Sequence, residues 1–207
     1  MRLFRPLLAL FLILFATCAY SASKTVLVLG DSLSAEYGIA RGAGWVALLE
    51  KRFQSEKINA RIVNASISGE TTSGGKARLP ALLGQHHPDI VILELGGNDG
   101  LRGLPVSATE ANLRAMINES KQSKAKVLLI GMQIPPNYGR EYADRFSGVY
   151  RRLAREGDVP LVPFLLEGVA DSPQLLQPDR IHPLAQGQSL MLNNVWPYLR
   201  PLLGLKR

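Results

Sequence analysis

The chain has 207 residues, 46% of them hydrophobic and 20% charged, and a formal net charge of +7. A chain of this length and composition can bury a core of its own as one globular domain, without help from disulfides or metals. The basic residues are scattered, and their densest group, Arg151, Arg152 and Arg155, has the spacing of a solvated helix face, so we expect no nucleic-acid partner and at most peripheral contact with a membrane.

The N-terminal segment has the pattern of a secretory signal. Arg2 and Arg5 precede an apolar run over 7–15, and small residues follow it. The run is too short to span a bilayer comfortably. We therefore assign 1–22 to a cleaved signal peptide and 23–207 to a single domain, and we expect the mature protein to be periplasmic or secreted.

Cys18 is the only cysteine. Cleavage after it leaves a chain without a thiol, which excludes disulfides, a cysteine nucleophile and cysteine-bound metal. Loss of Arg2 and Arg5 lowers the net charge from +7 to +5. Two alternatives stay open, a retained anchor and lipidation of Cys18, although Phe15-Ala16-Thr17 is a poor context for lipidation.

Strand and helix patterns alternate through the rest of the chain. Short runs of β-branched residues and leucine indicate buried strands, whereas Trp45, Leu49 and Phe53 recur as on one face of a helix. In chain order the patterns predict a strand over 24–29, a helix over 45–53, a strand over 60–64, a helix over 76–83, a strand over 89–95, a helix over 109–122, a strand over 126–130, a helix over 138–155, a strand over 160–162 and a helix over 184–199. This alternation is typical of an α/β fold whose parallel sheet is covered on both faces.

Polar motifs follow the first three predicted strands: Gly30-Asp31-Ser32-Leu33, Ser68-Gly69 and Gly96-Gly97-Asn98-Asp99. Ligands of such sheets bind outside the carboxyl ends of the strands, so we expect these motifs to share one edge. A fourth motif, Asp179-Arg180-Ile181-His182-Pro183, comes just before the last helix and must return to the same edge.

Ser32 and His182 are a candidate nucleophile and base. We expect Ser32 where a strand ends and a helix begins, so that its hydroxyl and N–H group face a substrate near a helix N-terminus. Asp179 lies three residues before His182, so its carboxylate can reach Nδ1 while Nε2 points outward. Gly-Asp-Ser is also common in ordinary turns, and only the combination of motifs favours catalysis. His86 and His87 are expected at the surface.

Three hydrogen-bond donors are candidates for stabilising an oxyanion: the N–H groups of Ser32 and Gly69 and the side-chain amide of Asn98. Loss of one such donor typically costs about 3 kcal/mol of transition-state stabilisation. For Gly96 and Gly97 a tight turn after the strand is the favoured explanation.

Several other site classes are excluded by spacing. Between Gly69 and Gly75-Lys76 lie five residues where a phosphate-binding loop requires four, and Ala77 replaces the hydroxyl residue that would bind the metal. The chain has no Gly-x-Gly-x-x-Gly after a strand and no His-Glu-x-x-His. It also lacks the Gly-x-Ser-x-Gly elbow of the common α/β-hydrolases.

The motifs resemble those of the GDSL, or SGNH, hydrolases, whose four motif letters fall on Ser32, Gly69, Asn98 and His182. The similarity covers nearly the whole mature chain, through the segments 30–34, 64–72, 77–83, 94–103 and 136–140. The resemblance implies an α/β three-layer sandwich, flavodoxin-like, with a five-stranded parallel sheet. It implies that Ser32 is the nucleophile, His182 the base and Asp179 its orienting carboxylate. It also implies an oxyanion hole formed by Ser32, Gly69 and Asn98, with no metal and no dissociable cofactor.

The resemblance further implies a serine esterase that acts on fatty acyl esters and thioesters, with thioesterase, lysophospholipase and arylesterase activity. We expect a monomer whose partners are small acyl esters or thioesters, including lysophospholipids. Leu101, Pro105, Ile134 and Tyr138 are candidate contacts of the acyl chain, although plain loop packing explains them equally well. Two other functions stay open: a carbohydrate acetyl esterase, and a non-catalytic periplasmic lipid-binding module.

Overall fold

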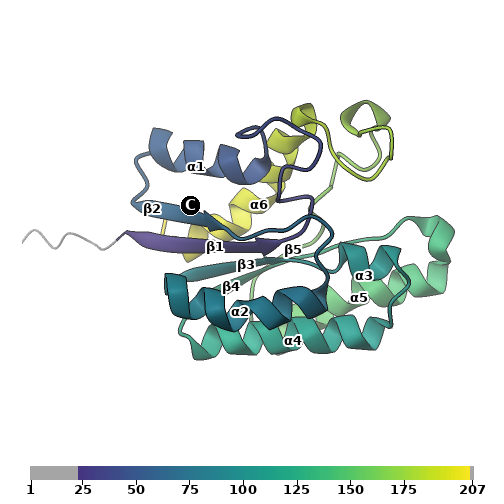
Figure 1. Ribbon diagram of the computed structural model, residues 1–207, viewed down its shortest axis with the longest axis horizontal. Coiled ribbons are helices and arrows are strands. Elements are labelled where there is room, and N and C mark those ends of the chain that lie inside the picture. Colours follow the sequence, from purple (N-terminus) through teal and green to yellow (C-terminus); the bar gives the residue numbers. More distant parts are fainter. Residues whose placement is uncertain (1–22, 206–207) are drawn as a thin grey trace, which may run out of the picture.

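The computed structural model describes residues 23–205, built around a five-stranded parallel sheet with strand order β2-β1-β3-β4-β5 (Figure 1). The strands are β1 (Lys24–Gly30), β2 (Ala60–Asn64), β3 (Ile90–Glu94), β4 (Lys126–Ile130) and β5 (Leu161–Val162). Each predicted strand agrees with an observed one to within a residue, and the order confirms the flavodoxin-like sheet. The predicted signal peptide and Cys18 lie outside the described residues.

The central strands are apolar on both faces because helices cover them on both sides. Every side chain of β3 is buried, and β1 is buried from Thr25 onward. Strand β2 lies at the edge of the sheet and is only partly buried. Gly30 pairs with Glu94 in the register of β1 and β3, so both strands end at the same level. Their following loops therefore start side by side at one edge.

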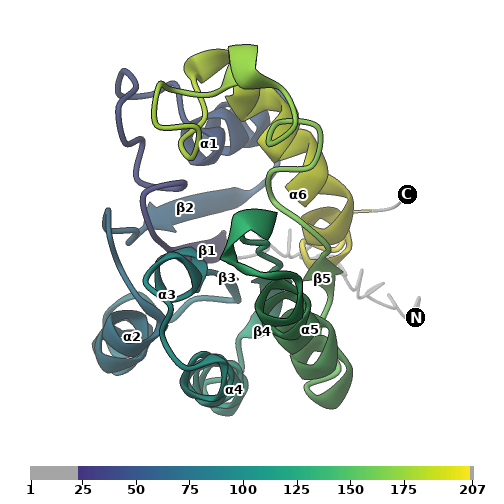
Figure 2. The same ribbon diagram turned by 90° about the vertical axis from the view of Figure 1, so that its right-hand side faces the viewer.

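In the described part of the chain, six helices complete the three layers: α1 (Trp45–Ser55), α2 (Thr72–His86), α3 (Gly97–Leu101), α4 (Val106–Gln122), α5 (Arg140–Glu156) and α6 (Gln188–Leu202). Helices α1 and α6 pack together on one face of the sheet, and α2, α4 and α5 cover the other face (Figures 1 and 2). Within residues 23–205, none of these helices combines the length and the apolar character needed to cross a bilayer. The predicted three-layer α/β architecture is confirmed.

Helix α2 is longer than the predicted helix over 76–83. It begins at Thr72, because the Thr71 hydroxyl caps it by accepting a hydrogen bond from the Gly74 N–H group at 3.3 Å. It also continues through Pro80 to His86. Pro80 lies on the exposed side of the helix, so the backbone carbonyl that loses its partner there can bind water.

Two further differences concern helix starts. Helix α3 was not predicted, because its five residues are too few to show a helical pattern. The last predicted helix, over 184–199, is divided between the 3₁₀ turn η3 (Ala185–Gly187) and α6, which passes Pro197 and ends at Leu202. The 3₁₀ turns η1 (Pro136–Tyr138) and η2 (Pro173–Leu175) lie in the long connections before and after β5.

Replacing each of two glycines with alanine should change the free energy of unfolding in opposite directions. At Gly131, which follows β4, an added Cβ would contact the Pro163 carbonyl oxygen and lie 2.8 Å from that of Val162. Gly131→Ala should therefore lower the free energy of unfolding by about 1–3 kcal/mol. At the exposed helical Gly84 an added Cβ meets nothing within 4 Å, so Gly84→Ala should raise it by about 0.5–1 kcal/mol. Urea denaturation of both variants measures the contrast, and equal effects would contradict this packing.

Candidate active site

Loops at the carboxyl edge of the sheet bring together Ser32, His182 and Asp179. His182 Nε2 lies 2.8 Å from Ser32 Oγ, although the two residues are 150 positions apart in the chain. His182 Nδ1 lies 2.7 Å from Asp179 Oδ2. In this arrangement the Ser32 hydroxyl donates to Nε2 and the Nδ1–H group donates to the carboxylate. The geometry is that of a serine nucleophile, a general base and an orienting acid.

The turn that carries His182 is stabilised by its own aspartate. Asp179 Oδ1 accepts the N–H groups of Ile181 at 2.9 Å and His182 at 3.0 Å, while Arg180 has a φ of +57°. Burial acts to raise the pKa of Asp179, but these two N–H groups and the imidazole outweigh it and lower the pKa below its ordinary value. The carboxylate therefore stays ionised opposite Nδ1.

Tyr37 packs against the His182 imidazole, a contact that sequence reasoning missed. The two ring centroids are 4.4 Å apart with an interplanar angle of 42°. The Tyr37 carbonyl oxygen accepts the Gln177 side-chain amide at 2.9 Å, and Gln177 N–H donates to the His182 carbonyl at 2.7 Å. Gln177 thus links the Tyr37 loop to the His182 turn and fixes one side of the imidazole.

The segment after Ser32 differs from the expectation. We expected a helix to begin there, but turns occupy the segment between β1 and α1, and α1 starts only at Trp45. The Asp31 carbonyl accepts the N–H groups of Ser34 and Ala35, and Asp31 Oδ1 accepts that of Leu33 at 3.1 Å. The segment that carries Ser32 is therefore held by hydrogen bonds to Asp31, and no helix dipole acts on its hydroxyl from a helix beginning there.

The two backbone N–H groups expected to bind an oxyanion have no acceptor within the described protein. Within residues 23–205, the N–H groups of Ser32 and Gly69 donate to no protein acceptor. Gly69 has a φ of +80°, a conformation that favours glycine, and its carbonyl accepts Arg102 Nη2 at 3.0 Å. The arginine therefore fixes the peptide group on the carbonyl side of Gly69.

Asn98 lies on the short helix α3, and its amide is already engaged. Nδ2 donates to Asp31 Oδ2 at 3.1 Å and to the Glu70 carbonyl at 3.0 Å. These two bonds tie Nδ2 to Asp31 and Glu70, the chain neighbours of Ser32 and Gly69, and use both of its hydrogens. An oxyanion must therefore share one of them or replace the Glu70 carbonyl. The turn expected at Gly96 is present, with a φ of +113°, whereas Gly97 is the first residue of α3.

Two buried acidic residues beneath the loops were missed by the sequence analysis. Glu94 is fully buried at the end of β3, where Oε2 accepts Ser34 Oγ at 2.6 Å and the Asp31 N–H group at 3.2 Å. Burial, and then the charge of Asp31, raises the pKa of Glu94 well above its usual range, so it holds a proton. Asp99 accepts the Thr72 N–H group at 2.9 Å and so joins α3 to the start of α2. The signal for Glu94 was a charged residue inside an apolar strand.

Asp31 itself is 2% exposed, and burial raises its pKa to about 6. The hydrogen bonds from Leu33 and Asn98 oppose this shift without cancelling it. The Asp31 carboxyl group therefore gains a proton more readily than an aspartate in water. The same carboxyl group accepts the hydrogen bond from the Asn98 amide.

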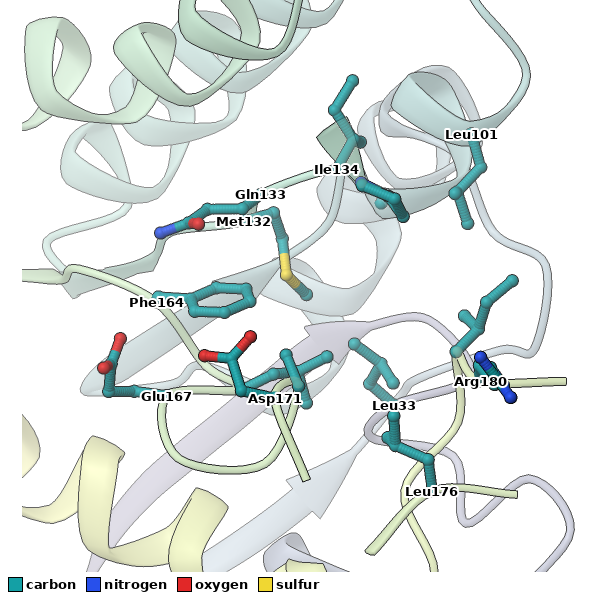
Figure 3. A pocket seen from close by; sticks show the side chains of 15 residues that line it. Leu33, Leu101, Met132, Gln133, Ile134, Phe164, Glu167, Asp171, Leu176 and Arg180 are labelled. Carbon is teal, nitrogen blue, oxygen red and sulfur yellow. The ribbon is translucent and has the colours of Figure 1, made fainter. Parts of the chain in front are cut away.

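A cavity of about 350 Å³ is lined by Leu33 and Ile181, the chain neighbours of Ser32 and His182 (Figure 3). Its wall contains mostly apolar side chains, among them Leu33, Leu101, Met132, Ile134, Phe164, Leu176 and Ile181. Glu167 and Asp171 lie towards one end and Arg180 towards the other (Figure 3). Of the four expected acyl contacts, Leu101 and Ile134 line this cavity, whereas Pro105 and Tyr138 lie outside its wall.

The remaining candidate groups lie elsewhere. His87 is exposed and His86 half-buried at the C-terminal end of α2, before β3 begins, and so at the edge of the sheet opposite Ser32. Among residues 23–205, no three His, Cys, Asp or Glu side chains gather in a way that would hold a metal ion.

Comparisons with known proteins agree with this fold. A model of the GDSL-like Lipase/Acylhydrolase family matches residues 28–190. The chain is 51% identical over 183 residues to esterase TesA of Pseudomonas aeruginosa, covering 88% of this chain and 91% of that protein. It is 47% identical over 195 residues to thioesterase 1/protease 1/lysophospholipase L1 of Escherichia coli K12, covering 94% and 92%. A crystal structure of TesA aligns with a TM-score of 0.85 at 51% identity, covering 86% of this chain and 99% of that one.

The raised pKa of Asp31 predicts a pH-dependent stability. Its pKa of about 6 lies above the usual 3.8, so folding gains stability from its protonation at low pH and loses it as the pH rises through 6. Asn at this position cannot ionise. Relative to the unaltered protein, Asp31→Asn should therefore gain about 2 kcal/mol in free energy of unfolding between pH 4 and pH 7.

Urea denaturation at a series of pH values measures this gain. Asp144→Asn is the matched control, because it removes an exposed carboxyl group that burial does not desolvate. A stability difference for Asp31→Asn that does not vary with pH would show that Asp31 is not desolvated as described.

Proposed function

The chain belongs to the GDSL-like lipase/acylhydrolase family and is a serine hydrolase of ester bonds, and we propose that Ser32 is its nucleophile, His182 its general base and Asp179 the acid that orients His182. The observation that carries the proposal is the pair of contacts at His182, 2.8 Å to Ser32 Oγ and 2.7 Å to Asp179 Oδ2. A carboxylate on Nδ1 stabilises the imidazolium that forms when Nε2 accepts a proton.

The proposed reaction transfers the acyl group in two steps. His182 Nε2 removes the proton of Ser32 Oγ, and the oxygen attacks the carbonyl carbon of the substrate. The imidazolium then protonates the departing alcohol or thiol, which leaves an acyl-serine ester. In the second step His182 removes a proton from water, the hydroxide attacks this ester, and Ser32 Oγ leaves with the proton. No other group is consumed.

The proposed oxyanion hole consists of the N–H groups of Ser32 and Gly69 and the Asn98 amide. Its support is that the two N–H groups have no protein acceptor in the described part of the chain, while Asn98 Nδ2 donates to Asp31, the chain neighbour of Ser32. As negative charge develops on the substrate oxygen, it becomes a stronger acceptor than the Glu70 carbonyl. Asn98 therefore stabilises the transition state more than the bound substrate.

For the substrate we propose fatty acyl esters and thioesters, including lysophospholipids. The apolar cavity supports this, because its wall accommodates a hydrocarbon chain. Leu101 and Ile134 would contact the chain, with Pro105 and Tyr138 at the entrance. The mostly apolar wall offers few hydrogen-bond partners to sugar hydroxyls, which disfavours a carbohydrate acetyl esterase, and a lipid carrier needs no triad.

We also propose that export removes residues 1–22 and that a monomer acts in the periplasm or outside the cell. The apolar run after Arg2 and Arg5 supports export. Strand β1 begins at Lys24, so this cleavage leaves every described element intact. All proposed catalytic groups come from a single chain, which supports the monomer. Lipidation of Cys18 is the alternative for the N-terminus.

Ser32→Ala should abolish release of p-nitrophenol from short and medium acyl esters, by a factor on the order of 10⁴ or more in kcat, because it removes the attacking oxygen. The midpoint of thermal unfolding should change little, because the hydroxyl fills no core volume. Ser172→Ala, at a half-buried hydroxyl before η2, is the control and should retain full turnover. Undiminished turnover by Ser32→Ala would remove Ser32 from the nucleophile role.

A larger side chain in the cavity should shorten the preferred acyl chain. Ala170 is exposed at the cavity wall, so Ala170→Phe can occupy the cavity without displacing the core. We expect kcat/KM to fall roughly tenfold or more for p-nitrophenyl octanoate and much less for the acetate. Ala111→Phe, on the exposed side of α4, is the matched control. Equal losses for both esters, or activity confined to acetylated sugars, would contradict the proposed substrate class.

A further inference from the structure

The large apolar side chains that remain exposed gather at the edge that holds the site. Six are strongly exposed among the described residues, and one of them, Leu190, lies on α6. The other five are between 37% and 50% exposed, and one comes from the segment after each strand: Tyr37, Ile67, Leu104, Tyr138 and Ile181. We call these five the rim residues. Single exposed hydrophobic residues are common, but a group of them on one edge of the molecule indicates an interaction surface.

Contacts between the loops show that the rim is continuous. Tyr37 packs on the ring of His182, which adjoins Ile181. On the other side, Arg102 Nη2 donates to the Gly69 carbonyl and so joins the segment of Ile67 to that of Leu104. Tyr142 Oη donates to the Leu104 carbonyl at 3.1 Å, which attaches this segment to the start of α5, beside Tyr138. Ile181 itself lines the cavity, so the rim and the cavity lie at the same edge of the sheet. Figure 2 views the molecule from this edge.

Basic side chains accompany the rim. Four exposed arginines lie in the same segments, and none of them forms an ion pair within residues 23–205: Arg41, Arg102, Arg140 and Arg180. Guanidinium groups without a carboxylate partner are well suited to phosphate groups.

The carboxylates of this edge are mostly engaged. Glu36 accepts the N–H groups of Gly42 and Gly44, Glu70 pairs with Arg78, and Asp179 pairs with His182. Among the described residues, Glu167 and Asp171 are exposed without an ion pair and lie in the cavity wall away from Arg180 (Figure 3), and Asp144 on α5 is also exposed and unpaired. The rim therefore presents, beside its apolar side chains, four guanidinium groups that no carboxylate of the described residues pairs with.

We propose that the rim docks onto the surface of an anionic phospholipid bilayer. The rim side chains enter the interface between head groups and acyl chains, and the arginines bind the phosphate groups. The cavity then opens towards the lipid, so an acyl chain reaches Ser32 without crossing water. This catalytic benefit rests on the proposed function, whereas docking itself does not. A second copy of the chain fits the rim less well, because a symmetric dimer would bring the same arginines face to face.

The test measures binding without turnover. Ser32→Ala protein, produced from the full chain, is sedimented with sucrose-loaded vesicles of phosphatidylcholine alone or of equal parts phosphatidylcholine and phosphatidylglycerol. We expect binding about tenfold or more stronger to the anionic vesicles, and we expect salt to weaken it. Because this protein cannot turn over, the result is independent of whether Ser32 is the nucleophile.

Two sets of variants in this background locate the surface. Ile67→Ser with Leu104→Ser should reduce binding roughly tenfold, whereas Leu190→Ser, at a comparably exposed leucine outside the rim, should not. Arg41→Gln with Arg140→Gln should reduce binding to anionic vesicles only, whereas Arg151→Gln with Arg155→Gln, on α5 away from the rim, should leave it unchanged. All these positions are exposed, and thermal unfolding checks that each variant is folded.

Three results would overturn the proposal. The first is the absence of binding to anionic vesicles. The second is binding that the rim variants do not reduce, which would assign it to a retained N-terminal segment or another surface. The third is self-association in solution that Ile67→Ser with Leu104→Ser abolishes, which would make the rim an interface between copies of this chain.

Discussion

The proposed chemistry depends on one contact, between His182 Nε2 and Ser32 Oγ, and the rest of the fold holds these two atoms together. A proton can pass between these atoms only if a loop after the first strand and a turn before the last helix meet to within a hydrogen bond. The parallel sheet makes this possible, because all five strands end at one edge and α6 returns the chain to it. Two hydrogen bonds then fix the turn that carries His182: Asp179 Oδ1 accepts the His182 N–H group, and the Gln177 N–H group donates to the His182 carbonyl. The precision of the site thus comes from short local bonds on a rigid sheet.

The layer beneath the site consists of buried acids rather than hydrophobic side chains. Asp31 holds Asn98 and the Leu33 peptide, Glu94 holds Asp31 and Ser34, and Asp99 holds the start of α2. Burial of a carboxyl group is unfavourable unless it is hydrogen-bonded or protonated, and both compensations occur here. Burying these acids lowers the stability of the folded protein, but their hydrogen bonds keep the loops in one geometry. This accounts for the polar residues at a place where the rest of the core is apolar.

The sequence predicted the strands, the edge and the pairing of Asp179 with His182, because each depends on local composition or on a spacing of three residues. It could not predict α3, whose five residues acquire their helical form from Asp99 bonding to Thr72, far away in the chain. The turns after Ser32 were mistaken for a helix for the same reason, since the Asp31 network replaces helical hydrogen bonds there. The contact between Tyr37 and His182 and the two hydrogen bonds of Asn98 form between loops that are far apart in the chain. Local sequence patterns do not predict such contacts.

The most direct measurement is a crystal structure of the protein after reaction with diisopropyl fluorophosphate. The account predicts phosphorus bonded to Ser32 Oγ, with the phosphoryl oxygen about 3 Å from the backbone nitrogens of Ser32 and Gly69 and from Asn98 Nδ2. It also predicts that His182 keeps its bond to Asp179. Phosphorus on another side chain would contradict the account, as would a phosphoryl oxygen turned away while Asn98 still donates to Glu70.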